Sequence, residues 1–504
     1  MAEDISAGAG LGQAELPEEE IFRQRKDKLE RLRNEGYDPF VNDHWDRDAT
    51  LLEIREKYDC LQAEEQSGDE LRTAGRVMVI RRHGKAAFAN LADEGGQLQL
   101  YFQQNELGEE QYAFFKKWID SGDIIGLSGI PFRTQRGELS IKVKSFTLLS
   151  KSLRPLPEKW HGLKDTEVRY RRRYVDLIAN PEVRDVFRKR AAIIQTFRRV
   201  LEEHGTLEVK TPILSTLAGG ANARPFITHH NALDIDMYLR IATELYLKRL
   251  IVGMFGRVYE IGPNFRNEGM DPKHSPEYTA MEVYWAYGSY QDMMYITEKI
   301  LVACADALGS RRITYQGIDI DLTPPFKRAT MADLVREETG VDFLAITDAE
   351  ARGFAVERDV EAPRGSSKYE ILPLFFERFV EGKLIQPTFV IGHPTVISPL
   401  AKRNRENPEV TDRFELFING WEFANAFSEL NDPIDQRERF ADQSRRKEDG
   451  DEESHPFDED FVNALEYGMP PTGGLGIGID RTVMLLTDSR SIRDVILFPT
   501  MRPL

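Results

Sequence analysis

The sequence predicts an α+β protein in which a small N-terminal β-barrel precedes a larger domain built on an antiparallel β-sheet flanked by helices. Three observations support this class. The chain has 504 residues, which is too long for one ordinary domain. Residues 71–150 are a succession of short β-rich runs separated by glycine-rich turns. The remainder alternates amphipathic helical patterns with two long hairpin signals, and hairpins form antiparallel sheets.

Composition and charge narrow the functional classes. Charged residues make up 30% and apolar residues 41% of the chain, as in a soluble globular protein, and no run approaches the roughly 18 apolar residues of a membrane span. The N-terminus lacks the basic and apolar regions of a signal peptide, so we expect a cytoplasmic protein with no membrane partner. The net charge of −17 argues against non-specific nucleic-acid binding, and any RNA contact must be a local basic patch.

Residues 1–67 are predicted to form an N-terminal extension. Residues 1–16 are rich in glycine and alanine without periodicity, and we expect them to be disordered. From Pro17 to Gly36, apolar residues recur at helical spacing among many charged ones, which predicts an amphipathic helix. Thr50 is placed to cap a second helix. We expect both helices to pack on their neighbours.

Residues 68–150 are predicted to form one barrel domain. Its β-rich runs are Gly75–Arg81, Ala87–Leu91, Leu98–Phe102, Ile124–Ile130 and Leu139–Leu148. A helical segment, Glu109–Ile119, lies between the third run and the fourth. This is the pattern of an OB fold, whose strand face commonly binds single-stranded nucleic acid. Phe88 belongs either to the core or to a base-stacking surface, and the basic run from Arg81 to Lys85 favours the surface.

A linker and the larger domain follow. Prolines favour an extended path at the start of residues 151–180, which are predicted to be the linker. Residues 181–504 form the predicted larger domain. Within it, residues from about 327 to 385 are predicted to be a mainly helical insertion, and they contain no recognisable chemical motif.

The first hairpin signal in the larger domain is densely charged. Val258–Ile261 and Tyr278–Tyr287 are predicted to pair around a loop rich in glycine, proline and aspartate. Alternation along the second strand places Glu282 and Tyr284 on one face. Because the flanks are apolar, we expect this charged face to bind a ligand. The charged residues are Arg266, Glu268, His274, Glu277 and Glu282.

The second hairpin signal is centred on Asn419-Gly420, which favours a type I′ turn. A turn at these two residues pairs Phe417 with Glu422 and places Glu415 and Glu422 on one face. Like charges so placed repel, and such acidic pairs usually indicate a bound cation. Strict alternation sends the next polar positions to the opposite face, so we predict a bulge near Ala424. The positions that this bulge would bring into the same pocket are Asn425, Phe427 and Glu429.

Two glycine-rich segments add candidate ligand contacts. Residues 218–226 contain paired glycines, which permit close approach of the backbone to a ligand. Glu244 follows this segment and either caps the predicted helix Leu245–Val252, which is the common case, or faces a ligand. Residues 470–486 are predicted to be a glycine-rich strand that runs into an apolar helix containing Arg481.

Together, these segments resemble three motifs of the class II aminoacyl-tRNA synthetases. The stretch Phe265-Arg-Asn-Glu268, with its His-containing loop and Tyr278, is similar to motif 2. The predicted helix and strand over residues 181–212 resemble motif 1, which builds the dimer interface of the family and therefore implies a homodimer. The glycine-rich strand before Arg481 resembles motif 3. The resemblance implies an ATP-dependent ligase that acts in protein biosynthesis.

The resemblance spans residues 71–502 and is to subclass IIb, whose OB domain binds the tRNA anticodon. It implies that Phe88, Gln99 and Glu138 contact anticodon bases.

Within this subclass, the sequence is similar to the lysine-specific members, which act on tRNA(Lys). The chemistry of the residues supports lysine specificity independently of the resemblance. A lysine ammonium needs buried carboxylates, and Glu244, Glu282 and Glu429 offer three. A site for aspartate needs cations, and none of these positions supplies one. The resemblance implies that Glu244 and Glu429 hold the side-chain ammonium and that Glu282 holds the α-amino group. The implied L-lysine-binding residues are Gly220, Glu244, Glu282, Tyr284, Asn425, Phe427 and Glu429.

The resemblance also implies how ATP is bound. Arg266 is the implied catalytic residue, which grips the α-phosphate, and Glu415 and Glu422 are the implied ligands of Mg²⁺ on the phosphates. The implied ATP-binding residues are Arg266, Glu268, His274, Tyr278 and Arg481. Lysine would be activated as an adenylate and then transferred to the 3′ end of the tRNA.

Three other interpretations compete with this one. A sister synthetase for aspartate or asparagine shares both domains, but the three carboxylates argue against it. A nucleic-acid-binding paralogue with an inactive site is disfavoured by the intact Arg266, Glu268 and Arg481. A paralogue that transfers lysine to a protein would resemble the catalytic domain alone, and this chain retains the OB domain.

Overall fold

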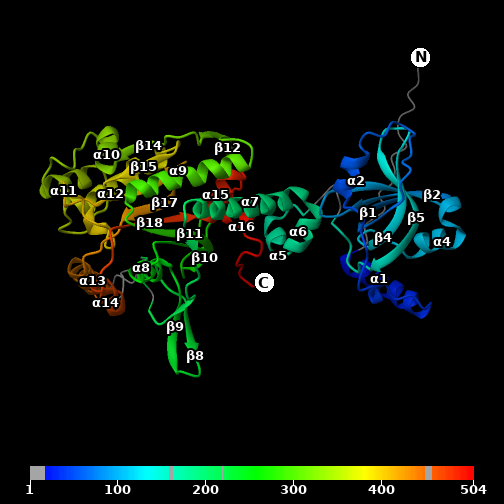
Figure 1. Ribbon diagram of the computed structural model, residues 1–504, viewed down its shortest axis with the longest axis horizontal. Helices are drawn as coiled ribbons and strands as arrows, with labels where there is room; N and C mark the ends of the chain where they lie inside the picture. Colours follow the sequence, from blue (N-terminus) through cyan, green and yellow to red (C-terminus); the bar gives the residue numbers. More distant parts are fainter. Residues whose placement is uncertain (1–16, 158–162, 218, 222, 449–456, 504) are drawn as a thin grey trace, which may run out of the picture. The chain divides into compact units, whose positions relative to one another are not determined.

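The computed structural model describes residues 17–157, 163–217, 219–221, 223–448 and 457–503 (Figure 1). The disorder predicted for residues 1–16 lies outside these residues. The chain divides into two compact units, Met1–Lys164 and Asp165–Leu504, which are described separately below. Among the described residues, no helix combines the length and the apolar character that crossing a membrane requires.

The first unit is the predicted barrel, in which five strands close in the order β1-β2-β3-β5-β4. The strands are β1 (Leu71–His83), β2 (Ala86–Ala92), β3 (Gln97–Gln103), β4 (Ile124–Arg133) and β5 (Leu139–Ser150). The predicted helix between the third strand and the fourth is α4 (Glu109–Trp118), and a short helix that was not predicted, α3 (Gln104–Leu107), precedes it. Alternate residues of the strands enclose a buried apolar core, to which α4 contributes Phe115 at ring stacking distance from Phe102.

The N-terminal extension contributes two of the predicted helices to this unit. They are α1 (Glu18–Asn34) and α2 (Leu51–Tyr58), separated by the short 3₁₀ helix η1 (Pro39–Val41). Thr50 caps α2 as predicted, because its side chain accepts from the backbone of Glu53 while the Glu53 carboxylate accepts in return. Leu32 of α1 and Leu51 of α2 are buried in the barrel's core, so both helices are part of the folded unit.

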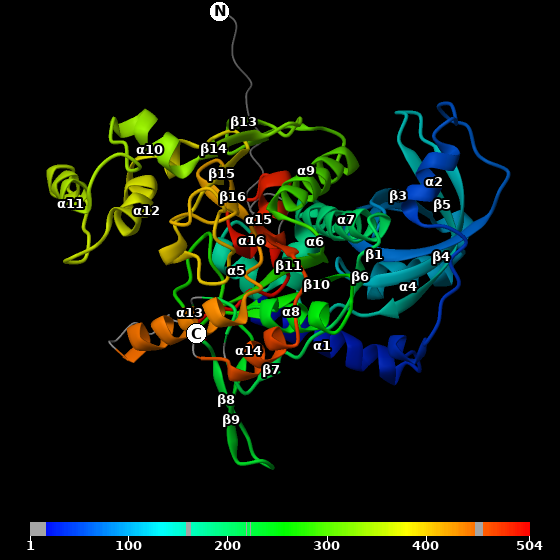
Figure 2. The ribbon, with the colours of Figure 1, turned by 60° about the vertical axis from the view of Figure 1, so that its left-hand side comes forward.

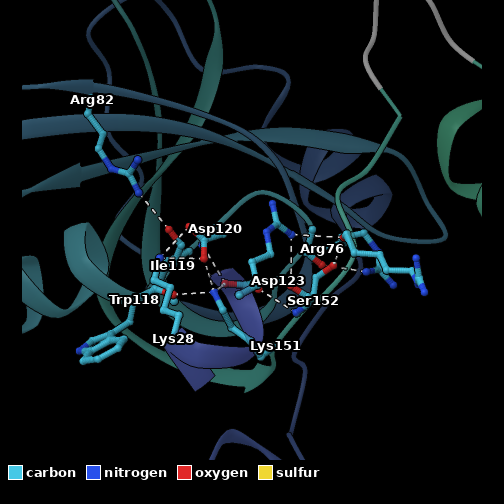
Figure 3. A network of polar contacts seen from close by, with 12 residues as sticks. Lys28, Arg76, Arg82, Trp118, Ile119, Asp120, Asp123, Lys151 and Ser152 are labelled. Atoms are coloured by element: carbon cyan, nitrogen blue, oxygen red, sulfur yellow. Dashed lines mark hydrogen bonds and ion pairs between the residues drawn. The ribbon is translucent and has the colours of Figure 1, made fainter. Parts of the chain in front are cut away.

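A buried lysine joins three segments of the first unit (Figure 3). Lys151 Nζ donates to Trp118 O at 2.7 Å, to Asp120 Oδ2 at 2.6 Å and to Asp123 Oδ2 at 2.7 Å. Lys28 of α1 bonds both oxygens of Asp120 at 2.7 Å. The ammonium therefore has three acceptors, and the ion pairs of this network join two lysines to two aspartates.

The second unit is built on an eight-stranded sheet of order β14-β15-β16-β17-β18-β11-β10-β6. The pairs β14-β15 and β10-β6 are parallel and the other pairs are antiparallel, so the sheet is mainly antiparallel, as predicted, with one parallel pair at each edge. The strands are β6 (Leu207–Glu208), β10 (Arg257–Phe265), β11 (Glu277–Ala286), β14 (Lys327–Thr330), β15 (Thr388–Ile391), β16 (Arg413–Ile418), β17 (Trp421–Ser428) and β18 (Thr472–Gly478).

Long helices cover one face of this sheet. The helices α7 (Pro181–Glu203) and α9 (Tyr290–Ala307) lie side by side over the sheet, with α15 (Ile479–Leu486) and α16 (Ile492–Val495) nearby (Figures 1 and 2). Apolar side chains from these helices and from the inner face of the strands form the largest buried cluster of the unit, which includes Phe197, Met281 and Val283. Residues Met281 and Val283 were predicted to lie on the face opposite Glu282, so the alternation along this strand is confirmed.

The remaining elements surround the sheet. Residues 165–180, which the sequence analysis placed in the linker, form α5 (Thr166–Arg171) and α6 (Arg173–Ala179) within the second unit. The predicted insertion contains α10 (Met331–Thr339), α11 (Asp348–Glu357) and α12 (Lys368–Phe379), which enclose a core of their own beside β14 and β15. The other elements are β7 (Leu214–Ser215), β8 (Ile227–His230), β9 (Ile235–Leu239), α8 (Glu244–Val252), β12 (Arg312–Tyr315), β13 (Ile318–Asp321), η2 (Glu381–Lys383), η3 (Thr395–Ile397), α13 (Pro433–Glu448) and α14 (Glu459–Glu466).

Candidate active site

One cavity of about 540 Å³ lies over the central strands of the second unit. It is lined by every residue that the sequence analysis assigned to lysine, ATP or Mg²⁺. Those residues are Gly220, Glu244, Arg266, Glu268, His274, Tyr278, Glu282, Tyr284, Glu415, Glu422, Asn425, Phe427, Glu429 and Arg481. They come from β11, β16, β17, α8, α15 and the connecting loops, so segments more than 200 residues apart in sequence meet here.

Glu282 is held at the base of the cavity by two donors. Its carboxylate accepts from the backbone N–H of Thr243 at 3.2 Å and from the Tyr284 hydroxyl at 3.2 Å. Burial in the cavity, with the nearby charge of Glu244, raises the pKa of Glu282 to about 7. The carboxylate therefore titrates near neutral pH, and a positively charged ligand that enters the cavity favours loss of its proton.

Glu244 faces the cavity and does not cap the helix. Thr243 is the N-cap residue of α8, and no side chain closes that cap. Glu244 is the first residue of the helix, and its carboxylate accepts from Lys248 Nζ one turn later at 2.5 Å. Of the two alternatives open at the sequence level, the structure therefore excludes the helix cap and places this carboxylate at the cavity.

Lys248 contacts two of the cavity carboxylates from behind, and sequence reasoning missed it. Its side chain is fully buried, and its ammonium forms ion pairs with both Glu244 and Glu429. Glu429 is 1% exposed, and its Oε1 has no hydrogen-bond partner within the described part of the chain. The sequence analysis found three carboxylates and no cation at these positions. The pairing escaped it because Glu429 lies 181 residues from Lys248, although the i, i+4 spacing of Glu244 and Lys248 was a visible signal.

Two glycines leave open the space beside the cavity carboxylates, which a larger side chain would fill. At Gly474 on β18, a Cβ atom would lie 1.9 Å from Glu429 Oε1 and 2.6 Å from Tyr284 Cε1, so this position accepts glycine alone. Gly220 has φ +92°, a conformation that favours glycine, and its Cβ would meet Ala242 at 3.2 Å. Gly474 was not predicted as a site residue, although glycines at 474, 476 and 478 alternate with the period of a strand face.

The second hairpin has the predicted geometry. Asn419 and Gly420 both have positive φ, and Phe417 pairs with Glu422. Leu416 then pairs with Ala424, so Phe423 is the extra residue of a β-bulge one position before the predicted site. The bulge resets the alternation of β17, and Glu422 and Asn425 consequently line the same cavity.

A second unpredicted cation lies beside this hairpin. Arg413 of β16 donates from Nε to Asn425 Oδ1 at 3.0 Å and pairs through Nη2 with Glu415 Oε1 at 2.5 Å. Desolvation in the cavity, followed by the charge of Glu415, raises the pKa of Glu422. Both carboxylates offer hard oxygen donors. No cluster of three or more His, Cys, Asp or Glu side chains suited to a metal is present among the residues that the structure describes.

The other end of the cavity carries arginines and rings. The Arg266 guanidinium lies 5.3 Å from the centre of the Tyr278 ring. Arg481 Nη1 donates to Glu422 O at 2.6 Å, and its Nη2 lies 3.3 Å from His274 Nε2. This end therefore combines cations with an aromatic face, as an anionic ligand with a planar ring requires.

A buried network fixes the position of Arg481. The neighbouring Asp480 accepts from Arg190 of α7 at 2.5 Å and from the backbone N–H of Thr279 on β11 at 2.6 Å. Arg190 also donates to the Thr279 hydroxyl at 3.0 Å. The start of α15 is thus tied both to α7 and to β11. The sequence analysis missed this network because its members are far apart in the chain.

The three predicted anticodon residues lie on or beside neighbouring strands of the barrel. Phe88 on β2 and Gln99 on β3 are half-buried, and Glu138, directly before β5, is exposed. Gln99 Oε1 accepts from the Ser140 hydroxyl at 3.0 Å. The Phe88 ring lies 4.9 Å from Tyr101, which in turn lies 5.9 Å from Phe132. The barrel therefore presents a row of three half-buried rings, of which only Phe88 was predicted.

Comparisons with known proteins agree with this architecture. Residues 165–502 match the family model of tRNA synthetases class II (D, K and N), and residues 71–149 match that of the OB-fold nucleic acid binding domain. Fold, cavity and comparison together define an aminoacyl-tRNA ligase, and the chain belongs to the class II tRNA synthetases.

The individual relatives show to which group within class II the chain belongs. The chain is 55% identical to the lysine–tRNA ligase of Syntrophomonas wolfei over 98% of its own length and 99% of the relative. It is 54% identical to the lysine–tRNA ligase of Halalkalibacterium halodurans, over 97% of this chain and 98% of the relative. It is 56% identical to that of Enterococcus faecalis, over 95% of this chain and 96% of the relative. Within class II, the chain is therefore a member of the lysine–tRNA ligase family.

Proposed function

We propose that this chain joins L-lysine to the 3′ end of tRNA(Lys). ATP first activates the lysine carboxylate, which attacks the α-phosphorus in line and releases pyrophosphate. The terminal ribose hydroxyl of the tRNA then attacks the carbonyl carbon of the lysyl-adenylate, and AMP leaves. The relatives described above bear the name lysine–tRNA ligase, and the observation that carries the proposal is the set of three carboxylates around one cavity.

The acidic end of the cavity supports lysine as the amino acid. Glu429 Oε1 is buried and lacks a partner among the described residues, so an ammonium group at this point would satisfy it. We assign the side-chain ammonium to Glu244 and Glu429, and the α-amino group to Glu282 and the Gly220 backbone. Tyr284 and Phe427 form the walls that surround the aliphatic part of the ligand.

ATP–pyrophosphate exchange with each of the 20 amino acids tests this assignment. We expect exchange with lysine alone. Exchange with aspartate or asparagine would contradict the assignment of lysine as the substrate, although the chain would remain a class II tRNA synthetase. No exchange with any amino acid, in protein shown to be folded by circular dichroism, would contradict the catalytic proposal as a whole.

The basic end of the cavity is assigned to ATP. Arg266 would bind the α-phosphate, and Arg266 and Asn425 together would bind the lysine carboxylate. Because Arg266 contacts both groups, it would bring the reacting atoms together. Tyr278 and Arg481 would enclose the adenine ring, Glu268 its amino edge and His274 the outer phosphates. Because phosphoryl transfer depends on positioning and charge stabilisation, no nucleophilic side chain is required.

Glu415 and Glu422 fit a magnesium ion that is shared with ATP. Mg²⁺ is usually held by one or two carboxylates together with substrate phosphates, and these two side chains supply oxygen donors whose mutual repulsion a cation relieves. When bound, Mg²⁺ would neutralise charge on the phosphates. Arg413, which pairs with Glu415, keeps that carboxylate oriented toward the cavity.

The barrel is assigned to the anticodon. Phe88 would stack on an anticodon base, and Gln99 and Glu138 would bond base edges beside it. The half-buried rings of Tyr101 and Phe132 continue the surface that Phe88 begins. Replacing Phe88 by Ala should raise KM for the tRNA about 10-fold or more while leaving lysine-dependent exchange unchanged.

We also propose that the protein is a cytoplasmic homodimer. Exposed apolar side chains gather around a depression beside the edge strand β6, where Met254 is 92% and Tyr287 is 85% exposed. A second copy of the chain would cover them. Sedimentation velocity should give the mass of two chains, and a M254E/Y287E variant should sediment as one.

A further inference from the structure

We propose that Lys248 is a positioning residue that acts as a built-in counter-ion, setting the charge of the cavity to match an amino acid with two ammonium groups. This inference rests on the proposed function, since it explains how the same cavity recognises lysine. Lys248 would not contact the reacting atoms. It would act through Glu244 and Glu429, which it holds in place and in their charged form.

The geometry supports a permanent role for this ammonium. Lys248 is 0% exposed and lies between Glu244 and Glu429, with the rings of Phe427 and Phe461 at 5.3 and 5.9 Å. A fully buried ammonium is costly to desolvate unless it is paired, so this side chain cannot leave its partners freely. It pairs with one oxygen of each carboxylate, and Glu429 Oε1 stays available to a ligand.

The charges around Lys248 explain why a counter-ion is needed. From α8, β11 and the end of β17, the titratable groups that face this region are Glu244, Glu282, Tyr284 and Glu429. Burial raises the pKa of Glu429, and the charge of Lys248 opposes that rise. Without Lys248, two buried carboxylates would repel each other and one would take up a proton.

The charge balance then matches a diamino acid. Above pH 7, where Glu282 is ionised, three carboxylates and one ammonium leave two negative charges in the empty cavity. Lysine brings two ammonium groups, and its carboxylate is assigned to Arg266, so the acidic end of the complex becomes neutral. An amino acid without a second ammonium would leave one carboxylate buried and unpaired, which is strongly unfavourable.

A Lys248→Met variant tests the inference, because methionine keeps most of the volume and removes the charge. One carboxylate should then be protonated in the empty cavity, and lysine must displace that proton to bind. We expect KM for lysine in ATP–pyrophosphate exchange to rise about 10-fold or more at pH 7 and to return toward the wild-type value at pH 9. The kcat at saturating lysine should change by less than about threefold.

The adjacent Arg249 supplies a matched control. It lies on the same helix but pairs with Asp458 at 2.9 Å, outside the carboxylate cluster. Arg249→Met should leave KM for lysine and its pH profile unchanged. If Lys248→Met does not fold, Lys248→Gln, which retains a hydrogen-bond donor without charge, should show the same pH-dependent KM.

Three outcomes separate the possibilities. A lower KM in Lys248→Met would mean that Lys248 competes with the substrate, and this would overturn the inference. A raised KM with an unchanged pH profile would reduce Lys248 to a packing role and also overturn it. Failure of the wild-type enzyme to exchange with lysine would contradict the proposed function itself, independently of either variant.

Discussion

The two units each bury a lysine, and the comparison separates a structural ion cluster from a functional one. Lys151 in the first unit has three hydrogen-bond acceptors, and its cluster contains two ammonium groups and two carboxylates. Lys248 in the second unit also has a fully buried side chain, but its cluster contains one ammonium and three carboxylates. Burial is therefore the same in the two units, whereas charge balance differs.

This difference indicates which cluster awaits a ligand. The first cluster is complete within the chain, and it ties α1 and the start of the linker to the turn after α4. The second leaves a buried carboxylate oxygen of Glu429 without a partner in the described residues. Buried polar groups are nearly always satisfied, so an incomplete cluster inside a cavity is a physical criterion for a binding site.

The largest expected effect comes from removing the charge of Glu429, whose Oε1 lacks a hydrogen-bond partner among the described residues. Glu429→Gln should lower kcat/KM for lysine in ATP–pyrophosphate exchange by about 10⁴-fold, because the substrate ammonium loses its buried counter-charge. Folding should persist, since Lys248 still pairs with Glu244. Near-normal exchange by this variant would falsify the assignment of the ammonium to Glu429.

Removing the lysine of the complete cluster should affect stability and not specificity. Lys151→Met leaves Asp123 buried without its partner, and we expect a loss of about 3–5 kcal/mol in the free energy of unfolding of the first unit. KM for lysine should not change in protein that remains folded. Urea unfolding followed by circular dichroism measures the loss.

A surface lysine of the same unit provides the control for that variant. Lys57 pairs with Asp69 at 3.0 Å, and both side chains are more than half exposed. Lys57→Met should cost much less stability than Lys151→Met. Equal losses in the two variants would show that the buried network contributes nothing beyond an ordinary surface pair.

Overpacking the cavity should have a smaller effect. A methyl group at Gly474 meets Glu429 Oε1, so Gly474→Ala should raise KM for lysine by about 30-fold, the equivalent of roughly 2 kcal/mol. Gly476→Ala is the matched control, because its Cβ would meet its nearest neighbours at 3.8 Å, an ordinary contact. Similar KM values for the two variants would contradict the close contact at Gly474.

Much of this site was predictable because it depends on local signals. The β-rich runs of the barrel, the type I′ turn at Asn419-Gly420 and the need for a bulge all follow from neighbouring residues, and the structure confirms them. The bulge is instructive, since the requirement that Glu422 and Asn425 share a pocket located it within one residue.

The contacts that were not predicted are long-range. Lys248 and Arg413 are ordinary residues in a helix and a strand, and their roles depend on partners that only the folded chain brings near. Arg190 and Asp480 are 290 residues apart. Periodicity gives the face on which a side chain lies, but it does not give the element packed against that face.

The smallest predicted effect is a pH dependence that distinguishes the two acidic groups of the cavity. Glu282 has a pKa of about 7 in the empty cavity, and only its ionised form attracts the α-ammonium. The affinity for lysine should therefore be nearly constant above pH 7 and should fall about 10-fold for each unit below it. Calorimetric titration in buffers of different ionisation enthalpy should detect release of one proton on binding near pH 6. Two protons would mean that Glu429 is also protonated, so that Lys248 does not keep it charged. An affinity that is independent of pH between 5.5 and 8 would instead exclude Glu282 from ammonium binding.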